Sequence, residues 1–293
     1  MNCLYCNSPH VEKSNFLRPT IFNKRQFTYF KCKDCHTISI DPTPTEAEKA
    51  IMFSPVYHKT YYPEEVKFEY PEIFALAEKY NSTCKSLLDF GCGNGSFLSY
   101  FKEKGGYECT GIDYGADLIN QLQRTYPGIH FYTSEQFSDA DIKEKFSIIH
   151  LGDVLSHIDR PNDLIQHLIT RYLDKEGIMI VEGPMENNFH LALVFRKLIS
   201  GVYSFFFKKK MAGHIPYHLT FTTADGQKKL FEKNGLHMVY WKVFETAWPY
   251  NDKPGNSIAS VMKYAIAKLS IFISNHTSAN FGNRFIYIGR NKA

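Results

Sequence analysis

Hydrophobic and polar residues alternate with two different periods from residue 86 to the end of the chain. Short apolar runs, typical of buried strands, separate segments whose apolar residues recur every three or four positions, as on one face of a helix. We expect strands over residues 86–90, 108–113, 129–132, 146–151, 177–181, 236–244 and 284–288, and helices over 96–104, 116–126, 163–173 and 223–234. This order predicts an α/β fold, in which helices cover a parallel sheet through right-handed crossovers.

A glycine-rich turn follows the first of these strands. Asp89 lies near the end of the apolar run, and Gly91, Gly93 and Gly95 alternate after it. Glycines let the backbone turn sharply and let a ligand approach without meeting a Cβ atom. The next strand ends in a second acid, Asp113, at the offset of about 20 residues where an acid meets ribose hydroxyls in nucleotide-binding folds. The pattern predicts a nucleotide-type cofactor at the carboxyl ends of the strands.

Four cysteines at the start of the chain form two pairs with the spacing of zinc knuckles. Cys3 and Cys6 make the first pair, and Cys32 and Cys35 make the second. Two such pairs about 25 residues apart match a four-thiolate zinc ribbon, and residues 11–29 between them can form its β-hairpin. A site with four protein ligands stabilises a fold and leaves no position for substrate. A redox dithiol would need only one pair, within a βαβ unit.

Composition places limits on the class of protein. The chain has 293 residues, 44% of them hydrophobic and 22% charged, which suits one large α/β domain and a small module. The formal net charge is +4, and four thiolates with one Zn²⁺ would lower it to +2, so the charge does not demand nucleic acid. Seven cysteines with no preceding signal peptide favour a reducing, cytoplasmic location. No apolar run reaches the ~20 residues of a membrane span.

These motifs resemble a known enzyme family. Residues 86–97 resemble motif I of the class I S-adenosylmethionine-dependent methyltransferases, and residues 111–113 resemble their acidic motif. Residues 146–158 and 173–181 are similar to the family's fourth strand and to its turn into strand five, although Ser156 stands where members commonly carry glutamate. Together with the cysteines and a tyrosine-rich segment at residues 57–63, this resembles a bacterial group with an N-terminal zinc ribbon. The resemblance implies a Rossmann-like, seven-stranded methyltransferase sheet preceded by a four-cysteine zinc ribbon.

The resemblance also implies which residues hold S-adenosylmethionine. The amino-acid part would lie against Asp89 and the turn formed by Gly91, Cys92, Gly93, Asn94 and Gly95. The ribose would bind Asp113, the adenine would lie beside Glu135, Gln136 and Phe137, and the sulfonium would lie beside Gly152 and Asp153. Tyr114, next to Asp113, is a further candidate for cofactor binding. Tyr57 and Tyr61 are candidates for the methionine end. The alternatives are core packing for the tyrosines and a solvated loop acid for Glu135.

Three histidines are candidates for the proton acceptor that methyl transfer to a hydroxyl requires. Histidine suits this role near neutral pH. His157 follows the fourth strand, while His214 and His218 precede the penultimate helix in a segment that resembles the family's histidine-aromatic motif. Local hydrogen bonding is the alternative role for all three. A metal site at His214 and His218 would lack a third ligand.

Two apolar segments lie outside the family pattern. Residues 189–207 end before three lysines, and apolar residues of 258–273 share one helical face. We expect them to form a lid that packs on the core above the acceptor site. Alternatively they form an interfacial surface for a lipid-linked substrate, with the lysines at the headgroups, or a dimer face.

The sequence therefore predicts methyl transfer to a small-molecule or carbohydrate-type acceptor, with oxygen as the methylated atom and a sugar nucleotide or glycan intermediate as the first candidate. An RNA methyltransferase whose ribbon grips RNA through residues 24–30 is an alternative, as are a lipid or quinone-like acceptor and a non-catalytic scaffold. We expect a zinc ribbon over residues 1–42, a linker with helices over 43–85, and the methyltransferase domain over 86–293, with insertions at about 185–220 and 249–280.

Overall fold

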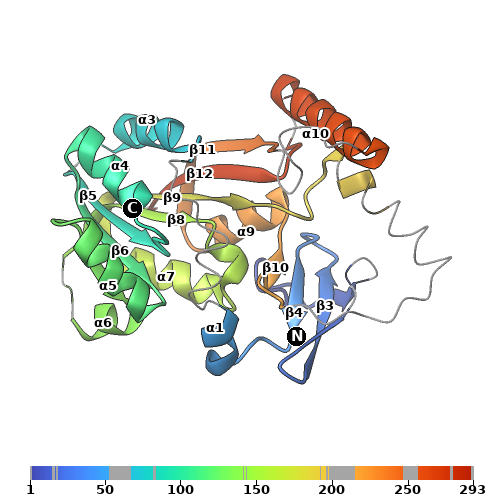
Figure 1. Ribbon diagram of the computed structural model, residues 1–293, viewed down its shortest axis with the longest axis horizontal. Helices are drawn as coiled ribbons and strands as arrows, with labels where there is room; N and C mark the ends of the chain where they lie inside the picture. The colour runs from blue at the N-terminus through green and yellow to red at the C-terminus, as the bar shows by residue number, and fades with distance from the viewer. Residues whose placement is uncertain are drawn as a thin grey trace.

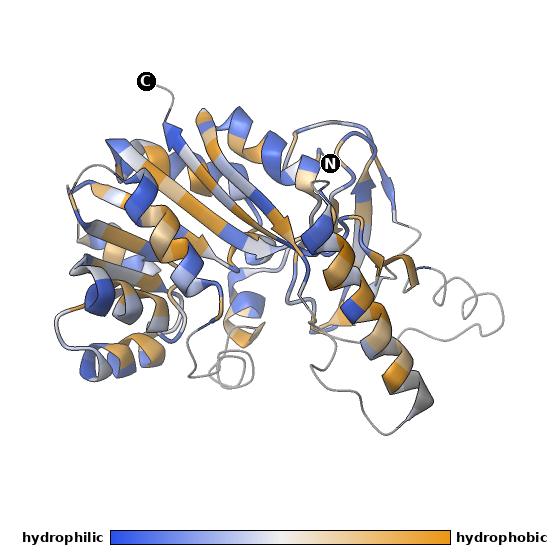
Figure 2. Cartoon of the chain, turned by 90° about the horizontal axis from the view of Figure 1, so that it is seen from above, coloured by the Kyte–Doolittle hydropathy of each residue, from blue (hydrophilic) through white to orange (hydrophobic). Residues whose placement is uncertain are grey.

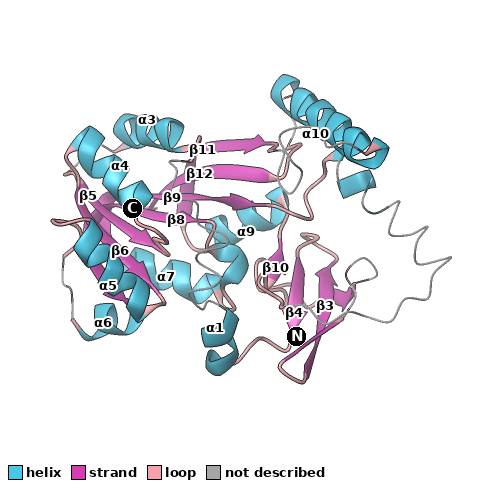
Figure 3. Cartoon of the chain, in the orientation of Figure 1, coloured by secondary structure: helices cyan, strands magenta, loops and turns pink. Residues whose placement is uncertain are grey.

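Two β-sheets organise the chain, and they lie side by side in the computed structural model (Figure 1). The structure describes residues 2–14, 17, 19–52, 67–81, 84–140, 142, 144–191, 193–195, 197, 215–246, 257–277 and 280–291. Figure 3 shows helices around the larger sheet, whereas mostly loops lie next to the smaller sheet. Tyr57, Tyr61 and His214, which were predicted as site residues, lie outside the described residues.

The larger sheet has seven strands in the order β11-β12-β9-β8-β5-β6-β7. The strands are β5 (Ser86–Phe90), β6 (Glu108–Asp113), β7 (His130–Thr133), β8 (Phe146–Gly152), β9 (Leu173–Pro184), β11 (Leu236–Phe244) and β12 (Arg284–Asn291). This confirms the predicted seven-stranded sheet. The prediction of a parallel sheet holds for β9, β8, β5, β6 and β7, but β12 runs antiparallel between β11 and β9.

Helices cover both faces of this sheet because its strands are apolar on both sides. Neighbouring residues such as Leu87 and Leu88 point to opposite faces and are both fully buried. One face packs against α3 (Tyr70–Tyr80), α4 (Ser96–Gly105) and α5 (Ala116–Thr125). The other packs against α6 (Ser134–Asp139), α7 (Pro161–Arg171) and α9 (Ala224–Lys233). The carboxyl ends of the parallel strands therefore remain uncovered by these helices, which is where ligands bind in such sheets.

The smaller sheet belongs to the N-terminal module but includes one strand from far along the chain. Its strands are β1 (Val11–Lys13), β2 (Thr20–Phe22), β3 (Arg25–Cys32), β4 (Ile38–Asp41) and β10 (Thr220–Phe221). Helix α1 (Glu46–Met52) follows, and its start has a capping box: the Glu48 amide donates to Thr45 Oγ1 (3.3 Å) and the Thr45 amide donates to Glu48 Oε2 (2.8 Å). The prediction of a ribbon within residues 1–42 omitted β10.

Helix α10 (Ile258–His276) presents four large apolar side chains to solvent, those of Val261, Met262, Leu269 and Phe272. Its buried residues are small or polar, namely Ala267, Ser270 and Ser274, whereas Met262 and Phe272 are each 59% exposed. Hydrophobic residues, orange in Figure 2, run along this helix. The prediction that this apolar face packs on the core is therefore wrong, because the helix docks through its small residues. Among the described helices, none is both long and apolar enough to cross a membrane.

Candidate functional site

The glycine turn after β5 is hydrogen-bonded to the carboxyl end of the neighbouring strand, β6. The amides of Gly91 and Cys92 donate to the Ile112 carbonyl at 2.8 and 2.9 Å. The Gly93 amide donates to Asp113 Oδ2 (2.9 Å), and the Tyr114 amide donates to Asp113 Oδ1 (2.7 Å). The Asp113 carboxylate is thereby held in one orientation beside the turn, as an acid that recognises a ribose must be.

A cavity opens at this point, at the carboxyl ends of β5, β6 and β8. It has a volume of about 860 Å³ counted out to its open mouth. Its described apolar lining consists of Phe90, Ile112, Val154 and Ile158, and Gly91, Tyr114 and Ser134 line it as well. Its charged and titratable lining consists of Glu46, Lys49, Asp113, Asp153, His157 and Asp159. We call it the larger cavity.

A second cleft also adjoins the glycine turn, with a volume of about 440 Å³ counted in the same way. Its described lining includes the predicted residues Asp89, Cys92, Asn94 and Gly152, and also Lys67, Tyr70, Ser96, Phe97, His150 and Glu182. Gly91 lines both this smaller cleft and the larger cavity. The two spaces therefore meet at one residue without a side chain. Gly93 and Gly95 are not among the described residues that line either space.

A buried carboxylate–imidazole pair forms part of the smaller cleft. His150 Nδ1 lies 2.7 Å from Asp89 Oδ1, and both side chains are 3% exposed. The Phe97 ring stacks on the imidazole with 3.8 Å between centroids. Because the carboxylate is the acceptor, Nδ1 carries the proton, and in the neutral ring Nε2 is an acceptor. That Nε2 is buried and has no hydrogen-bond partner among the described residues, so it fits a donor on a ligand.

Asp153 belongs to a charged network between the two spaces. Lys67 Nζ lies 2.6 Å from Asp153 Oδ2, and an Arg284 guanidinium nitrogen lies 2.9 Å from Asp153 Oδ1. Arg284 also pairs with Glu182 and Glu69. Burial favours the neutral acid, but the two cations outweigh it and hold the pKa of Asp153 well below its usual range. Asp153 is thus charged, and its backbone is left-handed with φ of 57°.

Two of the predicted histidines are close together. His157 lines the larger cavity, and its ring centroid is 4.8 Å from that of His218. His157 Nδ1 lies 2.8 Å from the Tyr217 carbonyl, which only accepts, so Nδ1 carries the proton and Nε2 is the basic atom of the neutral ring. Burial first, and His218 second, lower the pKa of His157 to about 3. It is therefore neutral at physiological pH.

His218 has a carboxylate partner that the sequence did not indicate. Its Nδ1 is hydrogen-bonded to Glu186 Oε1. Burial lowers the pKa of His218, but the attraction of Glu186 is stronger and the net shift is upward. Glu186 follows the fifth strand of the chain's α/β region, and polar residues at the carboxyl end of a strand are the signal that could have found it.

The segment expected to flank the adenine has mostly structural contacts. The Gln136 side chain completes the capping box of α6 with Thr133, and Phe137 is buried with its ring 4.9 Å from that of Tyr172. Glu135 is exposed in the first turn of α6. Ser134 is the residue of this segment that lines the larger cavity. The roles of residues 135–137 beside an adenine stay predictions.

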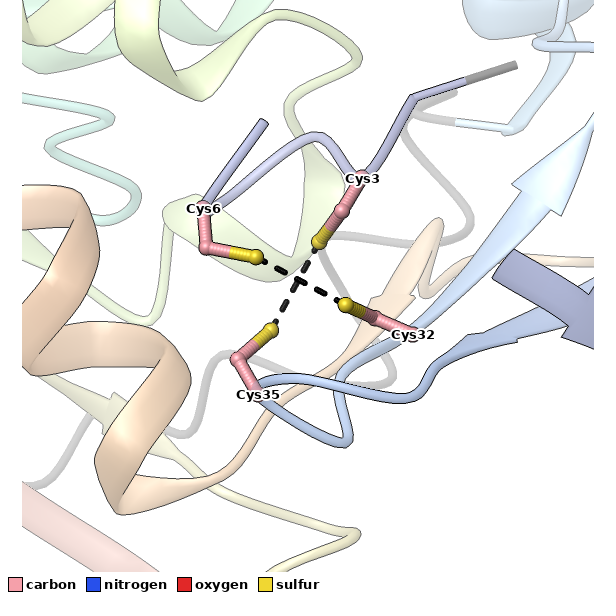
Figure 4. Close-up of side chains that lie close together, drawn as sticks. All are labelled: Cys3, Cys6, Cys32 and Cys35. Atoms are coloured by element: carbon pink, nitrogen blue, oxygen red, sulfur yellow. Dashed lines mark hydrogen bonds between the residues drawn. The ribbon is translucent and has the colours of Figure 1, made fainter. Parts of the chain in front are cut away.

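The four predicted metal ligands converge, as Figure 4 shows. The sulfurs of Cys3, Cys6, Cys32 and Cys35 all lie within 4.8 Å of one another, and the Cys3–Cys35 and Cys6–Cys32 pairs are each 3.6 Å apart. Sulfurs about 2.3 Å from a tetrahedral zinc ion lie about 3.7 Å apart, whereas a disulfide needs about 2.05 Å. The donor set therefore fits a four-coordinate metal ion.

Replacing Gly91 by alanine tests whether this turn must lack side chains. A Cβ there would lie 2.4 Å from Val154 Cγ2, and the backbone φ is +82°. We expect the free energy of unfolding to fall by about 1–3 kcal/mol, measured by urea denaturation. Gly106→Ala is the matched control, because φ there is +67° and no atom lies within 4 Å of the added Cβ. Equal losses in both variants would show that contact with Val154 does not matter.

Comparison with known proteins gives a family match and several distant likenesses. Residues 61–240 match the model of a methyltransferase domain family. A putative methyltransferase, 235L, of Invertebrate iridescent virus 6 is 23% identical over 173 residues, which are 58% of this chain and 62% of that protein. The chain thus spans less than two thirds of the length of this relative.

The likenesses to solved structures are weaker in sequence. A magnesium protoporphyrin IX methyltransferase from Synechocystis, solved with bound SAH, is 16% identical with a TM-score of 0.49, covering 84% of this chain and 98% of that chain. A geranyl diphosphate C-methyltransferase from Streptomyces coelicolor is 11% identical with a TM-score of 0.48, covering 86% and 88%. A SAM-dependent methyltransferase from Archaeoglobus fulgidus is 18% identical with a TM-score of 0.46, covering 76% and 94%.

Proposed function

Since this chain belongs to the methyltransferase domain family, of the S-adenosylmethionine-dependent class, we propose that it methylates a hydroxyl group of a small, carbohydrate-type acceptor. The observation that carries this proposal is that one cavity contains the oriented Asp113 carboxylate, the bare Gly91 backbone and a neutral histidine, His157. The carboxylate and the bare backbone can bind a nucleoside, and the neutral histidine can accept the proton of a hydroxyl group.

The chemistry of the two spaces supports a single cofactor that lies across Gly91. In the smaller cleft, the Asp89 carboxylate and the His150 Nε2 acceptor suit the amino group of an amino-acid tail. In the larger cavity, Asp113 suits ribose hydroxyls, and the open mouth gives an acceptor a way in. When bound, S-adenosylmethionine supplies an electrophilic methyl group on its sulfonium.

His157 is our candidate for the group that takes the hydroxyl proton. The Tyr217 carbonyl fixes the Nδ1 proton, so Nε2 would take the hydroxyl proton of an acceptor, while loss of the methyl group would leave the cofactor as the neutral thioether S-adenosylhomocysteine. Burial is the main cause of the low pKa of His157, and a charged His218 next to it lowers that pKa further. When His218 is neutral this repulsion disappears, and His157 is a stronger base than it is beside a charged His218. Glu186 controls the pH at which that happens, since it raises the pKa of His218.

Replacing Glu186 by glutamine tests this arrangement. Without the carboxylate, the pKa of His218 should fall below its value in the parent protein, so that deprotonation moves to lower pH. NMR titration of the histidine Cε1–H signals measures the shift, with Glu182→Gln as a comparison that removes a neighbouring carboxylate without touching His218. An unchanged pKa for His218 in the Glu186 variant would contradict the coupling.

The charges of the larger cavity favour a neutral acceptor. Its described lining has four carboxylates, Glu46, Asp113, Asp153 and Asp159, and one ammonium, Lys49. Lys67 and Arg284 offset the charge of Asp153, which leaves three carboxylates against the one ammonium. Carboxylates accept hydrogen bonds from sugar hydroxyls but repel phosphate oxygens. We therefore favour a glycan or glycoside over the diphosphate part of a sugar nucleotide.

A transfer assay with methyl-labelled S-adenosylmethionine distinguishes the acceptor classes. Neutral glycosides, sugar nucleotides, RNA and lipid extracts should be compared at matched concentrations, and His157→Gln should lower the rate with the true acceptor by about 100-fold or more. Label in a neutral glycoside, lost in the His157 variant, supports the proposal. Label in a sugar nucleotide instead supports a carbohydrate-type acceptor and contradicts the preference for a neutral one. Label in RNA alone, or a rate that His157→Gln leaves unchanged, contradicts it.

Two structural observations bear on the alternative acceptors. A lipid-type acceptor is the second candidate, because α10 exposes Met262, Leu269 and Phe272. Flotation with lipid vesicles tests it. RNA is less favoured, since Phe27 and Tyr29, which could have stacked on bases, are buried in the ribbon at 0% and 2% exposure.

We also propose that the cysteine cluster holds a structural zinc ion. The four sulfurs leave no coordination position for substrate. Burial and the neighbouring sulfurs raise the pKa of Cys6 to about 11, a shift that a bound divalent cation reverses. The ion would therefore stabilise the module and take no part in methyl transfer.

A further inference from the structure

The segments that carry His157 and His218 are both attached to the zinc module. Strand β10 pairs with β4 of the ribbon, with Thr220 opposite Ser39. Leu219, one residue after His218, accepts a hydrogen bond from the Ile40 amide at 2.9 Å. The Leu219 amide donates to the Ser156 carbonyl at 2.7 Å, next to His157. Both histidine segments and a ribbon strand therefore share one hydrogen-bond chain.

Tyr5, in the first cysteine knuckle, is hydrogen-bonded to the segments that contain His157 and His218. It lies between Cys3 and Cys6 in the sequence and is fully buried. Its hydroxyl donates to the Leu155 carbonyl at 3.4 Å, in the turn that leads to His157. The same hydroxyl lies 3.3 Å from Thr220 Oγ1, in the strand after His218. One side chain of the metal-binding knuckle thus bridges the two segments.

The second cysteine knuckle is hydrogen-bonded to the segment that carries Glu186, the partner of His218. The Asn187 side chain, next to Glu186, donates to the His36 carbonyl at 2.7 Å, and the Thr223 hydroxyl donates to the Cys35 carbonyl at 2.6 Å. The ring of Tyr29 contacts that of Phe221 at 5.7 Å, and Phe221 lies 6.2 Å from the His218 ring. Every segment of the His157–His218–Glu186 group is therefore supported by the ribbon.

We infer that the zinc module builds the acceptor side of the active site, with Tyr5 as a positioning residue for His157 and His218. This inference rests on the proposed function, which assigns those histidines to proton transfer. The cofactor side has separate support, because Asp89, Gly91 and Asp113 lie on β5, β6 and their turn. Loss of the Tyr5 hydroxyl should therefore loosen the histidines and leave cofactor binding intact.

The test compares Tyr5→Phe with Tyr29→Phe in the full-length, zinc-loaded protein. Both changes remove one buried phenolic hydroxyl from the ribbon, but only that of Tyr5 is hydrogen-bonded to the histidine segments. We expect amide hydrogen exchange over residues 155–158 and 217–221 to be about 10-fold faster in Tyr5→Phe. The NMR pKa of His218 should also move toward its ordinary value of about 6.5. The Tyr29 variant should match the parent protein in both measurements.

Unchanged exchange and an unchanged pKa of His218 in Tyr5→Phe would overturn the inference. If that variant does not fold, Thr220→Val decides, because it removes one partner of the Tyr5 hydroxyl and should speed exchange over the same residues. Calorimetric titration with S-adenosylhomocysteine separates the two proposals. If Tyr5→Phe binds S-adenosylhomocysteine with an affinity within two-fold of the parent protein, the division into an acceptor side and a cofactor side is supported. If this variant loses affinity for the ligand as well, the division is contradicted. A parent protein that does not bind would instead refute the proposed function.

Discussion

Asp113→Asn will weaken the binding of S-adenosylhomocysteine by about 10- to 100-fold. The carboxylate accepts hydrogen bonds from the amides of Gly93 and Tyr114, which orient it at the edge of the larger cavity. A hydrogen bond to a charged group contributes about 1.5–3 kcal/mol, which is a factor of about 10 to 150 in a binding constant. Asparagine keeps the size of the side chain but removes the charge and directs an NH₂ group toward amides that need an acceptor. Calorimetric titration measures the change.

Asp117→Asn is the matched control for this prediction. Asp117 lies four residues further on, is exposed in the first turn of α5, and lines neither the larger cavity nor the smaller cleft. It should bind the ligand as the parent protein does. Thermal unfolding of both variants separates a loss of affinity from a loss of folding. An Asp113 variant that is folded and binds within two-fold of the parent would show that this acid does not contact the ribose.

Cys32→Ser will remove the metal ion and lower the stability of the ribbon by several kcal/mol. Cys32 ends β3 and is 1% exposed, with its sulfur 3.6 Å from that of Cys6. Metal binding in small zinc modules contributes about 10–16 kcal/mol of apparent free energy, so the loss of one of four ligands is a large change. Zinc content by mass spectrometry should fall from one ion per chain to near zero, and the unfolding temperature should fall with it.

Cys84→Ser is the control, because Cys84 is exposed and lies outside the cysteine cluster. It should keep its zinc content and its unfolding temperature. Treatment of the parent protein with a chelator should reproduce the Cys32 variant. Parent protein from zinc-supplemented cells that contains no metal, together with a Cys32 variant of unchanged stability, would refute the zinc site.

Local patterns located the seven strands of the larger sheet, although β9 runs over Leu173–Pro184 where only residues 177–181 were predicted. Residues 108–113 and 236–244 are strands with the predicted bounds, since each apolar run follows a glycine that breaks the preceding helix. The glycine turn and Asp113 meet as predicted, because the carboxyl ends of neighbouring parallel strands lie at one edge of a sheet. The four cysteines likewise converge, because their spacing already defines two knuckles.

Contacts between distant segments could not be predicted in this way. The antiparallel pairing of β12 with β9 and the addition of β10 to the ribbon depend on pairings between residues 100 or more positions apart. Periodicity located the apolar face of α10, but it did not indicate that the small residues Ala267 and Ser270 dock on the body instead. Glu186 and Lys67 lie outside every motif, so only the folded chain shows their partners, His218 and Asp153.

The central claim is that one cofactor spans the smaller cleft and the larger cavity across Gly91. A crystal structure of the zinc-loaded, full-length protein with S-adenosylhomocysteine tests it most directly. We predict that the amino-acid end lies against Asp89 and His150, the ribose at Asp113, and the sulfur near Gly91 on the side of His157. A ligand bound elsewhere, or density for no ligand at saturating concentration, would contradict the claim.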